Sequence, residues 1–443
     1  MEVSIVVPHA ALDVGPGVAQ MWYLLTGRVG EDQEFSESSV GVLPPGLRLE
    51  APPIALATQT PLGALPPLTP AAAPIAPGEP LPSPQAPSKT APAPQAPMSP
   101  EIFAAAPAPQ APASPFLVLP KRSILFATNR TVRAATGTPS ERFGDDLDAT
   151  IRRGSCLVNI PIENHVQGSL ELPRWFNWND PTRFFLIDAT NILDDQEFRA
   201  MLRGGNSRRD VLIYVHGFNT PFDFAVMRLA QIVHDIRFAG VPVAFSWPSH
   251  GSVWDYDQDE QNAERSVDDL AAVLKEAIDE QAARPEALRG KVHVIAHSLG
   301  NRVTLRALDA LDSELPAGER PFGQLILAAP DVSVAEFTQR LPAAHRRSDR
   351  TSLYFCPDDN ALLASQARHP GEPRAGRGVV PVDGLDNIDA RKANTSFLGH
   401  GYWADVKQLL IDLQMLINLG WPPNQRVFTL ESVAGPPPYW GLR

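Results

Sequence analysis

The feature that most restricts the fold of this 443-residue chain is a series of short apolar runs separated by amphipathic segments. The runs are continuous enough to be strands buried on both faces. We expect such strands at 211–218, 241–247, 291–298, 324–331 and 352–359. The intervening segments place apolar residues at helical spacing, and we expect helices at 223–238, 267–278 and 301–311 and a last one around 406–416. This alternation predicts an α/β fold, with a mostly parallel central sheet flanked by helices.

The N-terminal quarter has a different composition. Half of the chain's 46 prolines lie between residues 41 and 120, among Ala, Ser and Gln. Repeated proline blocks helices and sheet pairing, so we interpret 44–120 as a disordered Pro/Ala-rich linker. A docking site for a proline-binding protein is the alternative. Residues 1–43 form a segment of unknown structure, and 121–443 form the α/β domain. The domain opens with three expected strands, at 123–130, 156–165 and 183–190.

Charge and apolar content narrow the range of partners. The net charge of −12 argues against nucleic acid or an anionic membrane as the main partner. The basic run Arg346, Arg347 and Arg350 is interpreted as solvated surface. No apolar stretch is long enough for a transmembrane helix, and the start lacks a clear signal peptide, which leaves cytoplasm and cell envelope both open. We expect Cys156 and Cys356 to be buried thiols and not a disulfide.

The strongest chemical signal is AHSLG at 296–300, between an apolar run and a helical segment. This context is typical of a nucleophile elbow, in which a tight turn presents a serine and forces it into a strained backbone conformation. Ser298 is therefore the candidate nucleophile, with the small residues Ala296 and Gly300 allowing strand and helix to approach. The alternative is an ordinary serine that caps a helix.

A second signal, HGF at 216–218, ends an earlier expected strand. Acyl transfer needs N–H donors for the developing oxyanion, one after the nucleophile and one from the loop after an earlier strand. Leu299 and Phe218 fit these two roles. Gly217 permits a close approach of the backbone, and His216 is then structural.

The remaining members of a triad follow the nucleophile in the order acid, then histidine. His400 lies between glycines just before the last expected helix, whereas His345 and His369 lie in polar, charged segments that we interpret as loops. Asp359 and Asp358 end one expected strand, and Asp331 ends the strand before it. Asp359 is the preferred acid and Asp331 its main alternative, unless Asp331 caps the helix that follows.

With these residues placed, the sequence resembles a bacterial branch of the α/β-hydrolase superfamily, whose members are described as α/β-hydrolases of unknown function or esterase/lipase-like enzymes. The resemblance spans about Ser123 to Trp440. It is carried in order by LFATNR, VHGFN, FSWPSHGSVWDY, AHSLGN, LAAPDV, DNAL and HGYW. The family pattern D-x-A-L falls on Asp359. The resemblance implies that FSWPS lines the pocket, although Ser246 and Trp247 fit the core equally well.

These residues predict a serine hydrolase that cleaves a carboxylic ester, small or lipid-like, through an acyl-enzyme on Ser298. No metal or organic cofactor is required by this chemistry. An amidase or thioesterase uses the same triad. A non-catalytic binding module of the same fold, tethered by the Pro-rich linker, is the alternative from another class.

Overall fold

The computed structural model describes residues 120–133, 142–173, 180–250, 255–393 and 406–443. The segment 1–43 and almost all of the linker 44–120 lie outside these residues, so both remain predictions. All the elements named below fall within one contact unit of the chain.

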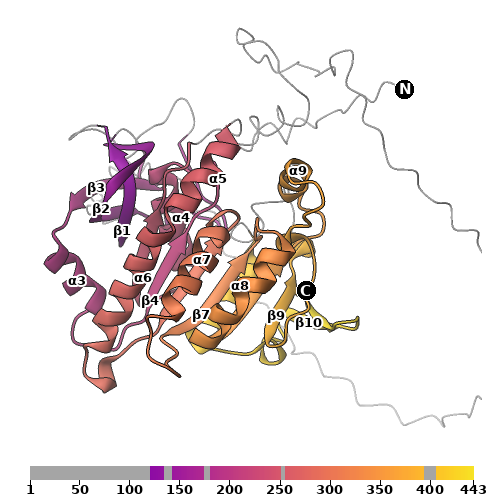
Figure 1. Ribbon diagram of the computed structural model, residues 1–443. Coiled ribbons are helices and arrows are strands. Elements are labelled where there is room, and N and C mark those ends of the chain that lie inside the picture. The colour runs from indigo at the N-terminus through magenta and orange to yellow at the C-terminus, as the bar shows by residue number, and fades with distance from the viewer. Residues whose placement is uncertain (1–119, 134–141, 174–179, 251–254, 394–405) are drawn as a thin grey trace, which may run out of the picture. The chain divides into compact units, whose positions relative to one another are not determined.

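A single mixed sheet forms the centre of the described domain (Figure 1). Its strands are β1 Lys121–Val132, β2 Phe143–Asn159, β3 Leu186–Ile192, β4 Val211–Val215, β5 Val241–Ser246, β6 Val292–His297, β7 Phe322–Ala328, β8 Ser348–Phe355, β9 Leu385–Asp389, β10 Leu430–Val433 and β11 Tyr439–Leu442. They lie in the order β10-β11-β9-β8-β7-β6-β4-β5-β1-β2-β3. Neighbours from β11 to β1 pair in parallel, whereas β10 with β11, β1 with β2, and β2 with β3 are antiparallel.

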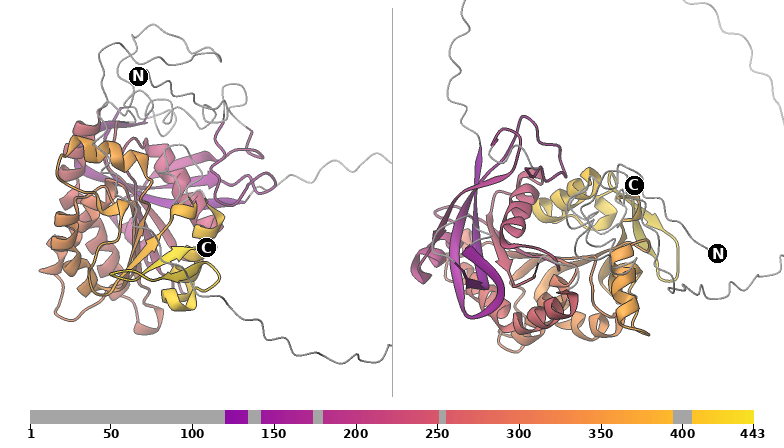
Figure 2. Two further views of the ribbon diagram at one scale, coloured as in Figure 1. Left: turned by 90° about the vertical axis from the view of Figure 1, so that its right-hand side faces the viewer. Right: turned by 90° about the horizontal axis from the view of Figure 1, so that it is seen from above.

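Helices cover both faces of this sheet. They are α3 Asp195–Arg203, α4 Phe222–Asp235, α5 Tyr256–Arg265, α6 Val267–Ala282, α7 Gly300–Asp312, α8 Val334–Arg347, α9 Asn360–Arg368 and α11 Lys407–Leu419. The helices α4 and α11 pack on one face, and α3, α6, α7 and α8 pack on the other (Figure 2). The predicted α/β arrangement with a mostly parallel sheet is therefore confirmed.

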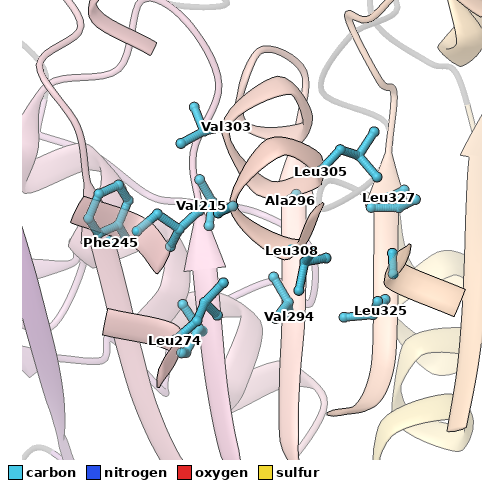
Figure 3. Packing of buried hydrophobic residues seen from close by; sticks show 14 of the residues in the cluster. Val215, Phe245, Leu274, Val294, Ala296, Val303, Leu305, Leu308, Leu325 and Leu327 are labelled. Carbon is cyan, nitrogen blue, oxygen red and sulfur yellow. The ribbon is translucent and has the colours of Figure 1, made fainter. Parts of the chain in front are cut away.

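Side-chain alternation in the central strands explains the two layers. In β4, Ile213 and Val215 join the cluster with α6 and α7, whereas Leu212 and Tyr214 join the cluster with α4 and α11. Figure 3 shows the first cluster, where Leu308 of α7 lies beside strand residues of β6 and β7. Burial of one such leucine contributes roughly 1.5–3 kcal/mol. Both faces of the central strands are thus apolar, which is why they read as continuous runs.

One sequence prediction about the first strands needs correction. The strand expected at 156–165 is the end of the much longer β2, and residues 161–164 form a turn. Pro161 has no N–H to donate to a ladder, so pairing stops there. The short β9, β10 and β11 carried no strand signal that we used.

The basic run also differs from its prediction. Arg347 is buried and donates to the carbonyl oxygens of Asp312 at 2.6 Å and Pro316 at 2.6 Å, so it caps the end of α7. Arg346 pairs with Asp312, and Arg350 pairs with Asp386 at 2.8 Å. Acidic side chains therefore offset the positive charges of this basic run.

Both cysteines are buried and neither forms a disulfide, as predicted. Burial raises the pKa of the Cys156 thiol to about 12, which keeps it protonated. Within the described residues, no helix has the length and apolar content needed to cross a bilayer.

Candidate active site

Ser298 occupies the turn between β6 and α7 with a positive φ of 52°. A non-glycine residue in this region costs roughly 1–3 kcal/mol and persists only where its surroundings impose it. The predicted strained conformation is therefore confirmed. The alternative of an ordinary helix cap is wrong, because the cap position of α7 is Leu299 and no side chain bonds there.

Hydrogen bonds from two directions hold this turn. The Ser298 N–H donates to the Ala328 carbonyl at 3.0 Å, and its carbonyl accepts from the Asp331 N–H at 3.2 Å. The Asn301 amide donates to the carbonyls of Ala296 at 3.1 Å, Ser298 at 3.2 Å and Ala328 at 3.0 Å. Neighbouring β7 and the first turn of α7 thus impose the conformation. Asn301, in the quoted motif AHSLGN, was not singled out from sequence.

The small residues around the turn permit close packing, as predicted. A Cβ added to Gly300 would lie 2.5 Å from the carbonyl oxygens of both Val215 and His216. Ala296 is fully buried and pairs with Val215 of β4 and Leu327 of β7. A larger residue at either position would separate α7 from the end of β4.

The loop after β4 packs against Ser298 at Gly217. A Cβ there would lie 2.8 Å from the Ser298 Cβ and 2.9 Å from the His297 Nδ1. Neither the Phe218 N–H nor the Leu299 N–H has an acceptor among the described residues. Within the described part of the chain these two backbone donors are therefore unpaired, and unpaired donors are what an oxyanion needs.

Three aspartates follow the neighbouring strands β7 and β8. Asp358 is exposed, with 64% of its side chain accessible beside Arg391. Asp359 is fully buried and caps α9, accepting from the Leu362 N–H at 2.9 Å. Burial and a fixed orientation favour Asp359 over Asp358 as an acid partner.

Asp331 is engaged by other side chains. One oxygen accepts from the Tyr256 hydroxyl at 2.7 Å, and the other accepts from the Ser365 hydroxyl at 2.6 Å. The Arg374 Nε lies 3.3 Å from the second oxygen. Burial and then the Asp331 charge raise the pKa of Tyr256 well above its usual value, so it remains a donor. The idea that Asp331 caps the following helix is wrong, since Ser333 caps α8.

The sequence model of a family described as "Alpha/beta hydrolase of unknown function (DUF900)" matches residues 194–418, just over half of the 443-residue chain. The chain belongs to this family. A search of curated proteins found no match. Membership supports hydrolase activity of some kind, and the matched segment includes the elbow and every candidate triad residue.

In this α/β-hydrolase the loop after β4 rests on a stacked pair of rings. His216 stacks on Trp247 with ring centroids 5.0 Å apart, and its Nδ1–H donates to the Gly217 carbonyl at 2.7 Å. Burial lowers the pKa of His216 to about 3, so the ring is neutral. Ser246 and Trp247 are fully buried, which places them in the core and not along an open pocket.

Arg130 is a buried residue of the site region whose role sequence reasoning missed. It donates to the Thr220 carbonyl at 2.7 Å, the Ser249 carbonyl at 3.1 Å and the Ser246 hydroxyl at 3.0 Å. Burial lowers its pKa to about 10, which leaves it charged at neutral pH. It thus joins the loops after β4 and β5. The quoted motif LFATNR contained it, but only the tertiary structure supplied its partners.

The structure describes two of the three histidines considered as the base. His400 of this α/β-hydrolase lies outside the described residues, so its placement remains a prediction. His345 lies in α8 and not in a loop. His369 ends α9, and its ring nitrogens lie 2.9 Å from the Ser365 carbonyl and 3.0 Å from Glu260. Both nitrogens of His369 are thus engaged by other groups.

Proposed function

We propose that the protein is a serine hydrolase that cleaves a carboxylic ester, small or lipid-like, through an acyl-enzyme on Ser298. The observation that carries the proposal is the strained Ser298 turn, with φ 52°, against which Gly217 packs directly. A serine imposed in this conformation at the carboxyl end of a parallel strand is the nucleophile arrangement of α/β-hydrolases.

The reaction would use groups from four loops. His400 accepts the Ser298 Oγ proton as Oγ attacks the carbonyl carbon, and the Phe218 and Leu299 N–H groups stabilise the oxyanion. The same proton passes from His400 to the departing alkoxide as the ester bond breaks. Water, deprotonated by His400, then hydrolyses the acyl-enzyme and regenerates Ser298.

Asp359 is the acid in this proposal, and it would orient the His400 ring and stabilise its charged form. Two observations support the choice. Asp359 is fully buried at the end of β8, whereas both oxygens of Asp331 already accept hydroxyl hydrogen bonds. We assign Asp331 the task of holding Tyr256 and Ser365 beside the nucleophile turn.

Labelling with a fluorophosphonate probe tests the nucleophile without knowledge of the substrate. The wild-type protein should be labelled, and Ser298→Ala should lose labelling and ester hydrolysis while keeping its circular dichroism spectrum. Ser313→Ala is the matched control, because Ser313 is exposed at the opposite end of the same helix. Labelling that persists in Ser298→Ala would move the nucleophile elsewhere.

Two further readouts separate the alternatives. A folded wild-type protein that is never labelled would favour a non-catalytic binding module of the same fold. Parallel assays on matched p-nitrophenyl esters, anilides and thioesters would distinguish an esterase from an amidase or thioesterase. We expect esters to be cleaved fastest.

A further inference from the structure

A cluster of ligand-type side chains lies away from the candidate active site. His165 belongs to the loop after β2, and His234 and Asp235 end α4. One ligand atom from each of these three residues lies within 4.8 Å of the others. The helix α4 runs from the carboxyl end of β4 toward the amino end of β5, so the cluster lies at the sheet edge opposite Ser298.

Hydrogen bonds already orient the cluster. The His165 Nε2 lies 2.7 Å from the Asp235 Oδ1, and its Nδ1 lies 2.9 Å from the Glu171 Oε2. The second Asp235 oxygen accepts from the Gln231 amide at 2.6 Å and the Gly168 N–H at 2.9 Å. The first oxygen therefore faces His165 in a fixed position.

His234 supplies a third ligand. Its ring packs edge-on to that of His165, with centroids 5.5 Å apart, and it has no hydrogen-bond partner among the described residues. A neutral imidazole nitrogen can offer its lone pair to a metal ion.

We propose that His165 Nε2, His234 and Asp235 Oδ1 bind one divalent transition-metal ion such as Zn²⁺, with water as a fourth ligand. Two imidazoles and a carboxylate are a ligand set that Zn²⁺ accepts in tetrahedral geometry. Glu171 would hold the His165 Nδ1–H, the carboxylate–histidine–metal arrangement that orients ligating imidazoles in many sites.

Metal binding requires the ligand atoms to adjust. Tetrahedral ligands about 2.0–2.2 Å from zinc lie roughly 3.3 Å from one another. The His165–Asp235 pair, at 2.7 Å, would open by about 0.6 Å, and a pair at the 4.8 Å limit of the cluster would close by about 1.5 Å. The side chains of His165 and Asp235 are only 6% and 2% accessible, and His234 is partly buried.

Metal binding at the His165 Nε2 requires loss of the proton that this nitrogen shares with the Asp235 Oδ1, 2.7 Å away. The Nδ1–H remains bonded to Glu171. The bound ion would tie the loop after β2 to the end of α4.

Titration of the chelator-treated full chain with ZnCl₂ tests the site by calorimetry. We expect one Zn²⁺ per chain, release of about one proton in buffers of different ionisation enthalpy, and a melting temperature several degrees higher with excess Zn²⁺. His234→Gln should weaken binding at least 10-fold and remove the thermal shift. Glu171→Gln should weaken it by about 10- to 100-fold.

His369→Gln is the matched control, because His369 pairs with a single carboxylate, Glu260. Its Zn²⁺ affinity should equal that of the wild type. Absence of Zn²⁺ binding by the wild type, or binding unchanged in both His234→Gln and Glu171→Gln, would overturn the proposal. Neither result bears on Ser298, since the readouts are binding and melting and not hydrolysis.

Discussion

Replacement of Gly217 by alanine tests whether the loop after β4 must contact the nucleophile. Gly217 does not adopt a positive φ, so alanine meets no backbone strain there. The obstacle is contact, because the new Cβ would lie 2.8 Å from the Ser298 Cβ. Relief to an ordinary separation of 3.4 Å requires a shift of about 0.6 Å. His297 on the other side restricts this movement, since its Nδ1 would be at 2.9 Å.

This shift is comparable to the tolerance of a catalytic group, which is about 0.5 Å. A misplacement of 1 Å typically costs about 100-fold in rate, so we expect kcat of Gly217→Ala to fall by roughly 10- to 100-fold. KM should change little, because the oxyanion contact forms mainly in the transition state. Overpacking of this kind costs about 1–3 kcal/mol, which lowers the melting temperature by several degrees without unfolding the protein.

The assay compares kcat, KM and thermal unfolding of wild type, Gly217→Ala and Gly378→Ala on one p-nitrophenyl ester. Gly378 is a matched control, because its backbone is extended and its added Cβ would have no neighbour within 4 Å. Wild-type kcat in Gly217→Ala would refute the reasoning that this loop supplies an oxyanion donor. A loss of activity explained entirely by unfolding would refute it as well.

Three other predictions follow from the same structure. Asp359→Asn should lose on the order of 10⁴ in kcat, whereas Asp331→Asn should keep more activity and lose stability. The comparison of kcat between the two folded variants tests which aspartate is the acid. The reverse pattern would make Asp331 the acid. The folded pKa of His165 is raised to about 9, so its contribution to the free energy of unfolding should be complete below about pH 6.5 and be lost as pH rises through 9. Denaturant unfolding at several pH values, with a chelator present, measures this contribution. If His165→Gln kept the wild-type dependence of the unfolding free energy on pH, the prediction would be wrong. Removal of residues 1–115 should leave an active domain with one cooperative unfolding transition, and loss of that transition would show that the removed part packs on the domain.

The sequence predicted the central strands well because they are buried on both faces. Residues of β4 and most residues of β5, β6 and β7 are apolar, and this pattern needs no knowledge of neighbours. In β8 only the last three residues, Leu353–Phe355, are apolar, and the strand begins four residues before its predicted start. The edge strands were harder. The exposed half of β2 and the four-residue β10 and β11 owe their conformation to pairing with distant segments, which local pattern does not report.

The candidate site divides in a similar way. The strained turn at Ser298 was predicted from sequence because the strand, the turn and the helix are contiguous in the chain. Asp359 and Asp331 were not separable from sequence, because each ends a buried strand at the same edge of the sheet. Their partners differ, since Asp331 accepts from Tyr256 and Ser365, 75 and 34 residues away, whereas Asp359 accepts from the nearby Leu362 N–H.

By itself, the sequence determined the fold class, the position of the nucleophile turn and the small residues around it, since each depends on a continuous segment of chain. The tertiary structure alone decided which polar groups are satisfied and where. Arg130 holds loops that begin about 90 and 116 residues away from it, and the His165 cluster joins groups 70 residues apart. Buried polar groups must find partners wherever the fold brings them, so their roles depend on contacts that no local pattern contains.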